Sequence, residues 1–478
     1  MMEATSKNEK FVGQAMERVE DEALLRGIAH YADDYATRVD THHAAILRSP
    51  HAHATIISID TSEALAQPGV VAVITGEDIK KFSDPFLNVI KVPGMNLWSL
   101  ATDRVRYVGE AVACIVARDR YLAEDALDYI EVEYDILEPV VDPVAAAAMD
   151  APRIHPDAGP NVMSEREYTY GDPDKAFAEC DKVVDLTIDF PRNSHTPIEC
   201  YVVVAEYHAG EGHYDVLSNF QGPFSVHPVM CRALRIQNSK LRLRTPALSG
   251  GGFGIKVAVF PYIVLMSIAA RISGKPVKWV EDRLEHLAAA TAAPNRVVNL
   301  QAAAMKDGRV TGFRYHQTDD YGAYLRAPMP GPLVRMHGVM TGAYDVKNLY
   351  IHNQLVMTNK CPSGMVRGFG GPQMYYALER VMHRIAIELD LDPLEVIRKN
   401  LVPSGAFPYH CAAGAILDSG DYPKAVEIAQ KDGRLDELKR RRDEARAEGR
   451  IYGIGYAAVI EPTQSNMGYI TTMLTKEE

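Results

Sequence analysis

The sequence predicts a protein of the α+β class that is divided into several domains. Three observations lead to this prediction. The chain has 478 residues, enough for about three domains at roughly 150 residues each. Apolar residues make up 47% and charged residues 24%, the composition of a globular protein with a large core. Segments with the period of strands alternate with segments with the period of helices along much of the chain.

The first predicted domain, residues 18–140, has a compact α/β pattern. Apolar runs rich in β-branched residues predict strands over residues 69–75 and 106–117. Residues 121–129 have helical character, and the alternation over residues 131–137 predicts a half-buried strand. A sheet with helices packed on it is therefore expected in this part of the chain.

Two further regions follow a stretch rich in Ala and Pro, residues 142–160, which predicts a linker. Residues 161–405 contain long strands broken by glycine-rich loops. The last region, residues 422–478, starts with a strongly charged stretch over 422–449 that predicts a solvated helix. An apolar strand pattern over 451–470 then predicts the opening of a further domain. Because a first strand has unpaired edges, it either folds back on this chain or is completed by a partner.

Two glycine loops carry the strongest local signal for a ligand. The first, residues 249–256 (SGGGFGIK), follows a strand predicted over 241–248. The second, residues 367–373 (RGFGGPQ), precedes a helix predicted over 374–389. Such loops let backbone N–H groups approach an anion, so two of them predict a bulky anionic ligand held from two sides, although tight turns alone give the same pattern. The common nucleotide-binding patterns both fail at Ile255.

Several classes of protein are excluded by charge and composition. The net charge of −12 argues against nucleic acid or an anionic membrane as a partner. The longest apolar run, residues 257–270, contains a proline and is expected to be too short for a bilayer. The six cysteines are scattered without a C-x-x-C pair, so they predict no disulfide framework and no iron–sulfur cluster. We therefore expect a reduced, cytoplasmic protein with no membrane partner.

Other polar residues are weaker candidates for a site. Four histidines lie near one another in the sequence: His42, His43, His51 and His53. Their spacing matches no zinc motif, so core or surface histidines are expected. Glu199 and Cys200 lie in an apolar segment, where a structural hydrogen-bonding role is favoured over catalysis. Arg335, flanked by apolar residues, either pairs with a carboxylate or orients an oxygen-bearing substrate.

Seven segments together resemble one family. RVEDEALLRGIAHYADD, RSPHAHATIISIDTSEALAQPGVVAVITGEDI and VRYVGEAVACIVARDRYLAEDALDYIEVEYDILEPVVDP resemble its N-terminal hammerhead domain. SGGGFGIK, GKPVKWVEDRLEHL, DDYGAY and MVRGFGGPQ resemble the first part of its cofactor-binding region. The family is the molybdopterin-binding large subunit of the molybdenum hydroxylases, the group of xanthine dehydrogenase, aldehyde oxidase and carbon monoxide dehydrogenase. The resemblance implies a hammerhead α/β domain at 18–140, the first part of a molybdopterin-binding α+β domain at 161–405, and the start of a further domain at 422–478.

The resemblance also implies a cofactor, in which the dithiolene of a pyranopterin holds molybdenum and no protein side chain ligates the metal. The pterin is molybdopterin itself or its cytosine dinucleotide form. A glutamine approaches the metal, a glycine loop lines the cofactor, and an arginine of the second loop lies near it. These positions correspond here to Gln221, Gly251, Gly252, Phe253, Gly254 and Arg367.

Three residues match substrate positions of the family. Phe369 stands where purine-oxidising members place an aromatic that stacks on substrate, and Arg335 where they place a substrate-orienting arginine. Those members have a glutamate where this chain has Val257. A valine cannot bond a ring nitrogen, so the resemblance favours an aldehyde, a ketone or an N-heteroaromatic substrate over a purine.

Most members of the family continue for about as many residues again, and that half holds a second cofactor loop and the glutamate general base. We therefore expect a naturally split large subunit whose catalytic base lies on a second molybdopterin-binding chain, with [2Fe-2S] clusters and FAD on further subunits. The expected reaction oxidises carbon with water as the oxygen source. Two alternatives remain at this point: a molybdenum-dependent hydratase that adds water to an activated double bond, and an assembly subunit without cofactor.

Overall fold

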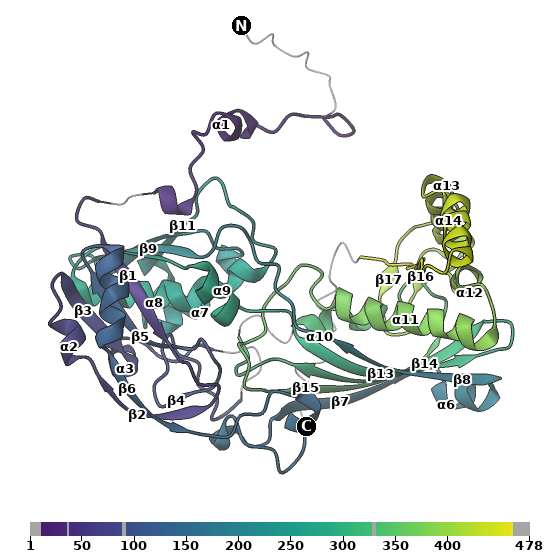
Figure 1. Ribbon diagram of the computed structural model, residues 1–478, viewed down its shortest axis with the longest axis horizontal. Helices are drawn as coiled ribbons and strands as arrows, with labels where there is room; N and C mark the ends of the chain where they lie inside the picture. Colours follow the sequence, from purple (N-terminus) through teal and green to yellow (C-terminus); the bar gives the residue numbers. More distant parts are fainter. Residues whose placement is uncertain (1–10, 36–37, 88–91, 327–330, 462–478) are drawn as a thin grey trace, which may run out of the picture.

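The computed structural model describes residues 11–35, 38–87, 92–326 and 331–461, and these form two lobes (Figure 1). The first lobe contains a seven-stranded sheet with the order β11-β10-β9-β12-β1-β5-β3. Its strands, in chain order, are β1 His42–Arg48, β3 Val70–Thr75, β5 Ala111–Ala117, β9 Val202–His208, β10 His213–Ser218, β11 Leu241–Arg244 and β12 Val277–Val280. A three-stranded sheet lies beside it, formed by β4 Arg104–Val105, β2 Ala54–Asp60 and β6 Glu131–Ile136.

The second lobe contains a five-stranded sheet with the order β7-β15-β14-β13-β8. Its strands are β7 Val162–Tyr170, β8 Lys182–Phe190, β13 Asn295–Ala304, β14 Val310–Asp320 and β15 Asn348–Val356. A small hairpin, β16 Tyr409–His410 and β17 Ile416–Leu417, lies beyond it. The longest helix, α11 Gly371–Leu389, lies across one face of the five-stranded sheet (Figure 1).

The remaining helices connect and cover these sheets. In the first lobe they are α2 Ser62–Leu65, α3 Gly76–Phe82, α4 Arg120–Asp125, α7 Pro223–Ala233, α8 Phe260–Ser273 and α9 Arg283–Ala289. In the second they are α6 Pro173–Glu179, α10 Gly331–Arg335, α12 Pro393–Asn400, α13 Tyr422–Asp432 and α14 Leu435–Ala447. Helix α1 Asp21–Leu25 stands clear of the first lobe and has no buried residue (Figure 1). Helix α5 Pro143–Ala146 contacts β13 and β14 of the second lobe. The α+β class predicted from the sequence is confirmed.

The seven-stranded sheet combines segments that lie far apart in the sequence. β12 pairs in parallel with β1, with His42 opposite Val277, and antiparallel with β9. β5, which reads AVACIVA, lies between β1 and β3 and is buried along its whole length. The regions predicted as separate domains, residues 18–140 and 161–405, therefore share one sheet.

Helix α8 forms the core under this sheet. It is buried from Phe260 to Ala270, as expected of a helix that is apolar all round. With the 3-10 turn before it, the helical stretch Ile255–Ser273 is 19 residues long and apolar enough, by length and composition, to cross a membrane. The expectation that this run is too short is therefore wrong. However, 89% of its most apolar window is buried inside the protein, as in the core helix of a globular protein.

Several predicted elements are present, and others need correction. The strands over 69–75 and 131–137 and the helix over 374–389 are confirmed as β3, β6 and α11. The strand predicted over 106–117 begins only at Ala111, because Arg106 N–H donates to Glu110 Oε2 at 2.5 Å and closes a turn. The helix over 121–129 divides into α4 and a 3-10 turn. The strand over 241–248 ends at Arg244.

The stretch predicted as a linker is packed into the protein. Ala146 and Ile154 are fully buried, and the Asn161 side chain accepts the N–H of Ile154 and donates to the carbonyl oxygen of Ala146. The charged stretch over 422–449 forms two helices in place of one. Arg434, whose φ is 50°, separates α13 from α14.

The segment after α14, residues 451–461, folds back along α11. It has no strand pairing, in contrast to the predicted strand. Ala458 N–H donates to Glu379 Oε2 at 2.9 Å, and the Tyr375 hydroxyl donates to the carbonyl oxygen of Ile460. The remainder of the predicted strand pattern, from residue 462 on, lies outside the described residues.

Candidate functional site

A buried ion pair holds the first glycine loop, residues 249–256. Lys256 Nζ lies 2.6 Å from Glu199 Oε2, and the same oxygen accepts the N–H of Gly250 at 2.9 Å. Burial alone would raise the pKa of Glu199, but the hydrogen bonds from Lys256 and Gly250 outweigh it and hold this pKa below its usual value. Burial lowers the pKa of Lys256, and the Glu199 carboxylate only partly offsets this. Glu199 thus has the structural role expected from the sequence.

Gln221 contacts the centre of the first glycine loop. Its Oε1 accepts the N–H of Gly254 at 2.8 Å, and no partner of its Nε2 lies in the part of the chain that is described. A Cβ at Gly252 would lie 2.6 Å from Gln221 Oε1, so only glycine fits there without moving the amide. Gly251 and Gly254 have φ values of 95° and 96°, which glycine adopts readily.

The two glycine loops meet through their backbones. Arg367 N–H donates to the carbonyl oxygen of Phe253 at 2.8 Å. His195 contacts both loops: its ring lies edge-on to Phe253 of the first loop, and its Nε2 is 3.3 Å from the carbonyl oxygen of Arg367 in the second. A Cβ at Gly254 would lie 2.7 Å from the carbonyl oxygen of Met365. This glycine therefore permits the close approach that joins the loops.

Arg335 contacts the second loop from the other side. Its Nη1 donates to the carbonyl oxygen of Gly368 at 2.9 Å, and its Nη2 lies 2.7 Å from Glu461 Oε1. Arg335 therefore pairs with a carboxylate, which is one of the two roles expected from the sequence. This carboxylate, Glu461, lies on the segment after α14. Phe369, at a φ of 37°, lies against Gly331, where a Cβ would come within 2.1 Å of its ring.

A cavity of about 200 Å³ opens beside the second loop. Arg367, Phe369 and the buried Gln373 line it. Gln373 Nε2 donates to the carbonyl oxygen of Pro294, whereas its buried Oε1 has no partner among the described residues. Gln373 therefore borders the cavity, and its buried amide oxygen is unsatisfied within the described chain. Val257 is buried at the start of the helical stretch, 6% exposed.

The loops leave donors free for an anionic ligand. Within the described chain, the N–H groups of Gly252 and Phe253 have no acceptor, and the exposed Arg367 side chain has no polar partner. Free backbone N–H groups on a glycine loop and an unpaired guanidinium fit a phosphate-bearing group. The residues present therefore fit the bulky anionic ligand that the two glycine loops predicted from the sequence.

The four histidines near the N-terminus lie in separate surroundings. Where the structure describes the chain, none of them belongs to a group of three metal-capable side chains. His42 and His53 place Nδ1 at 2.9 and 3.0 Å from backbone carbonyl oxygens, and His51 lies edge-on to Tyr134. These contacts agree with the structural histidines expected from the sequence.

Some residues of the site had only a weak signal in the sequence, or none. Lys256 stands in the quoted loop motif, but its partner Glu199 is 57 positions away. Gln373 is the last residue of the second loop motif, but the sequence does not show that its Oε1 is buried without a hydrogen-bond partner among the described residues. His195 and Glu461 lie in no motif, so their places beside Phe253 and Arg335 follow from the tertiary structure alone.

Comparison with known proteins gives two family matches. A profile described as "Molybdopterin cofactor-binding domain" matches residues 154–401. A second, described as "Aldehyde oxidase and xanthine dehydrogenase, a/b hammerhead domain", matches residues 26–138. The two matches follow one another in the order that the sequence resemblance implied.

Individual relatives extend these matches. The chain is 34% identical over 464 residues to the nicotine 6-hydroxylase large subunit of Paenarthrobacter nicotinovorans, covering 96% of this chain and 56% of that one. The crystal structure of quinoline 2-oxidoreductase from Pseudomonas putida 86 superposes with a TM-score of 0.86 at 32% identity, covering 92% of this chain and 56% of that one. This chain thus spans about half the length of these relatives.

A relative of similar length also matches. The nicotinate dehydrogenase large molybdopterin subunit of Eubacterium barkeri is 31% identical over 423 residues, with 86% of this chain and 94% of that one covered. Together with the hammerhead and cofactor-binding matches, these relatives establish the family. The chain belongs to the molybdopterin-binding large subunits of the molybdenum hydroxylases, the family of xanthine dehydrogenase, aldehyde oxidase and carbon monoxide dehydrogenase.

Proposed function

We propose that this chain is the cofactor-holding half of a split molybdenum hydroxylase that oxidises a ring carbon of an N-heteroaromatic compound. The observation that carries the proposal is the joint between the two glycine loops, where Arg367 N–H bonds the carbonyl oxygen of Phe253. Gln221 contacts the first loop at Gly254, and Arg335 contacts the second loop at Gly368, so both side chains adjoin the joined loops. The molybdenum–pterin group supplies the oxidation chemistry when it is bound, with water as the oxygen source.

The residues of this chain hold and orient that group. The N–H groups of Gly252 and Phe253 and the guanidinium of Arg367 are free to bind its phosphate oxygens. Gln221 accepts the Gly254 N–H through Oε1, and this bond fixes the amide so that its Nε2 donates toward the ligand. Gly251, at a φ of 95°, gives the loop a turn that glycine adopts readily. None of these contacts requires a protein ligand to molybdenum.

The general base is proposed to lie on a partner chain. The 94% coverage of the Eubacterium barkeri subunit, against 56% for the nicotine hydroxylase subunit, supports a division of the large subunit into two polypeptides. The partner would supply a glutamate base and a second cofactor loop. Further subunits would carry [2Fe-2S] clusters and FAD, and the complex would be cytoplasmic. The pterin would be molybdopterin itself or its cytosine dinucleotide form.

The names of three relatives and three residues of this chain support the substrate class. Three of the matched relatives are named for nicotine, nicotinate and quinoline, and others for carbon monoxide, xanthine and aldehydes. Val257 is apolar and buried, so it offers no partner to the extra polar groups of a purine. Phe369 borders the cavity beside the second loop and can stack on an aromatic ring. Arg335 would orient a substrate oxygen or stabilise negative charge that develops during oxidation.

The proposal is tested on the complex purified from its source under mild conditions. We expect a second molybdopterin-type chain of similar mass and about one molybdenum per pair of chains. Nicotinate and quinoline should reduce an artificial electron acceptor, with xanthine and an aliphatic aldehyde as comparison substrates. A metal-free complex would indicate an assembly subunit. Water addition without acceptor reduction would indicate a hydratase, and recovery of only a longer polypeptide would contradict the split.

A further inference from the structure

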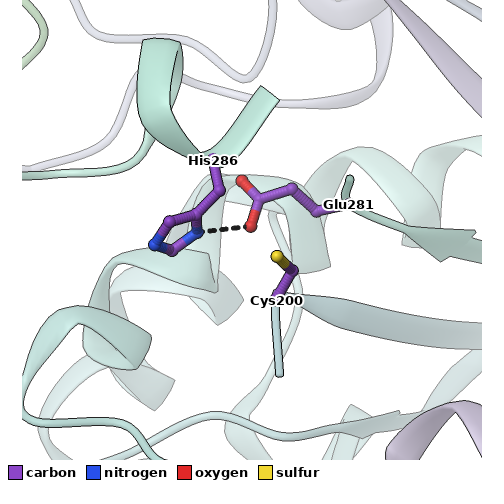
Figure 2. A group of neighbouring side chains, drawn as sticks. All are labelled: Cys200, Glu281 and His286. Atoms are coloured by element: carbon purple, nitrogen blue, oxygen red, sulfur yellow. Dashed lines mark hydrogen bonds and ion pairs between the residues drawn. The ribbon is translucent and has the colours of Figure 1, made fainter. Parts of the chain in front are cut away.

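Three side chains with metal-binding groups come together outside the glycine loops: Cys200, Glu281 and His286 (Figure 2). Cys200 precedes β9, Glu281 follows β12, and His286 lies on α9. Because β9 and β12 are adjacent and antiparallel, the start of one strand and the end of the other lie together. The cluster is therefore carried by paired strands and a helix and not by a loose loop.

The geometry of the cluster is tight. One ligand atom from each side chain lies within 4.8 Å of the other two. His286 Nδ1 is 2.7 Å from Glu281 Oε2, and this oxygen also accepts the N–H of Tyr201 at 3.1 Å. Glu281 N–H donates in turn to the carbonyl oxygen of Tyr201 at 2.9 Å. These backbone bonds fix the carboxylate beside the thiol and the imidazole.

Two buried atoms of the cluster are unsatisfied. Glu281 is 3% and His286 1% exposed. Glu281 Oε1 and His286 Nε2 have no hydrogen-bond partner among the described residues. A buried polar atom without a partner costs about 1–3 kcal/mol, so two in contacting side chains are unusual for groups with a purely structural role. Figure 2 shows that the second ring nitrogen of His286 points away from Glu281 and Cys200, so the atoms that face one another are Cys200 Sγ, Glu281 Oε2 and His286 Nδ1. An ion bound there would replace the hydrogen bond between Nδ1 and Oε2.

We propose that Cys200, Glu281 and His286 bind one divalent ion of the zinc type. Thiolate, imidazole and carboxylate are the three ligand classes that zinc takes from proteins. As the sulfur–metal bond forms, the thiol proton leaves to solvent, and no electron is transferred. One thiolate and one carboxylate then balance the dipositive ion, so the complex is neutral in a buried place where net charge is unfavourable. Water completes the tetrahedron from the partly exposed Cys200 side.

The ion would act as a clamp behind the cofactor loop. Cys200 adjoins Glu199, whose carboxylate holds Lys256 and Gly250 of the first loop. Fixing Cys200 to β12 and α9 would therefore restrain the loop at its attachment point. The ion contributes no ligand to the pterin site and is independent of the proposed redox function.

The test uses the full chain, stripped with a chelator and free of molybdenum. Titration with Zn²⁺ by calorimetry should give one ion per chain. Titration with Co²⁺ should give the visible bands of tetrahedral cobalt and a near-ultraviolet thiolate–cobalt charge-transfer band. Cys200→Ser should abolish the charge-transfer band and weaken binding at least about 100-fold, since loss of mere outer-shell partners already costs 10–100-fold. Cys180→Ser is the matched control, because Cys180 is also a half-buried thiol but lies at the end of α6.

Several results would overturn the proposal. No Zn²⁺ uptake by the stripped chain, or Co²⁺ spectra without a thiolate band, would each contradict it. So would equal metal affinity in Cys200→Ser and Cys180→Ser. His286→Gln removes a fully buried imidazole and can impair folding, so the spectra of the unmodified chain decide the question without that variant. Because the readout needs no molybdenum, a failed metal titration leaves the hydroxylase proposal standing.

Discussion

Lys256 Nζ lies 2.6 Å from Glu199 Oε2, with the ammonium fully buried and the carboxylate 12% exposed. This pair connects the end of the first glycine loop to the segment before β9. Glu199 also accepts N–H groups from Gly250 and, at 3.2 Å, from Ala32. The Ser249 hydroxyl donates to it as well, at 3.5 Å, so removing the cation would leave the carboxylate with neutral donors among the described residues. This one ion pair therefore contributes both to the position of the first glycine loop and to the stability of the folded chain.

The first prediction concerns that pair. Lys256→Met should lower the free energy of unfolding by about 3–5 kcal/mol, because it leaves a buried charge without its partner. Lys278→Met is the control: its ammonium lies 2.6 Å from Asp33, whose side chain is 58% exposed, so the loss should stay below about 1 kcal/mol. Urea unfolding of both variants gives the comparison. Equal losses would contradict the role assigned to the pair.

The second prediction concerns the space at Gly252. Gly252→Ala would place a Cβ 2.6 Å from Gln221 Oε1, displacing the amide from Gly254. We expect a loss of about 1–3 kcal/mol from overpacking and less molybdenum per chain in the purified complex. Gly210→Ala is the control, because its Cβ would have nothing within 4 Å. Full molybdenum content in Gly252→Ala would show that the Gln221 contact is dispensable for the cofactor.

The third prediction is a pH dependence. Burial raises the pKa of Glu379 to about 7. A carboxyl whose folded pKa is raised binds its proton more tightly in the folded state, so stability is highest below the unfolded value of about 4.5 and falls as the pH rises toward 7. The shift corresponds to about 3 kcal/mol. Glu379→Gln should remove this decline when unfolding is measured between pH 5 and 8.

A second glutamate on the same helix serves as the control for this pH series. Hydrogen bonds from Arg384 and Lys182 hold the pKa of Glu388 below its usual value, so Glu388 stays ionised throughout the range. The stability of Glu388→Gln should therefore run parallel to that of the unmodified chain. A decline that persists in Glu379→Gln would assign the pH dependence to another group.

The fourth prediction separates cofactor binding from folding. The Arg367 side chain is exposed and has no polar partner among the described residues, so Arg367→Met should change the free energy of unfolding by less than about 0.5 kcal/mol. Molybdenum per chain should nevertheless fall. Arg446→Met, on the exposed face of α14, should change neither quantity. Elemental analysis beside thermal unfolding measures both, and an unchanged molybdenum content would remove Arg367 from the cofactor contacts.

The sequence predicts local features well because their signals are local. The 3.6-residue period over 374–389 identifies α11, and the apolar β-branched run over 69–75 identifies β3. Both glycine loops are recognisable from their composition, although their joint is not, because the partners Phe253 and Arg367 are 114 positions apart. The turn at Glu110 could not be predicted from hydropathy, because it lies within an apolar run. The hydrogen bond from Arg106 N–H to the Glu110 carboxylate closes this turn, so the strand begins later than predicted.

Long-range contacts account for the rest. The cluster of Cys200, Glu281 and His286 forms because β9 and β12 are neighbours, and no spacing rule encodes that pairing. Likewise, the contact of Glu461 with Arg335 depends on the segment after α14 folding back along α11. Such contacts become visible only when the topology is known.

The parallel pairing of β1 with β12 has a consequence for synthesis of the chain. His42 meets Val277 in the sheet, so β1 must wait for β12 to emerge from the ribosome. At about 5–20 residues per second, this wait is on the order of tens of seconds. During it, the β12-facing edge of β1 is an open template for pairing with other chains. Pairing of this edge with another chain before β12 is made would compete with formation of the native sheet.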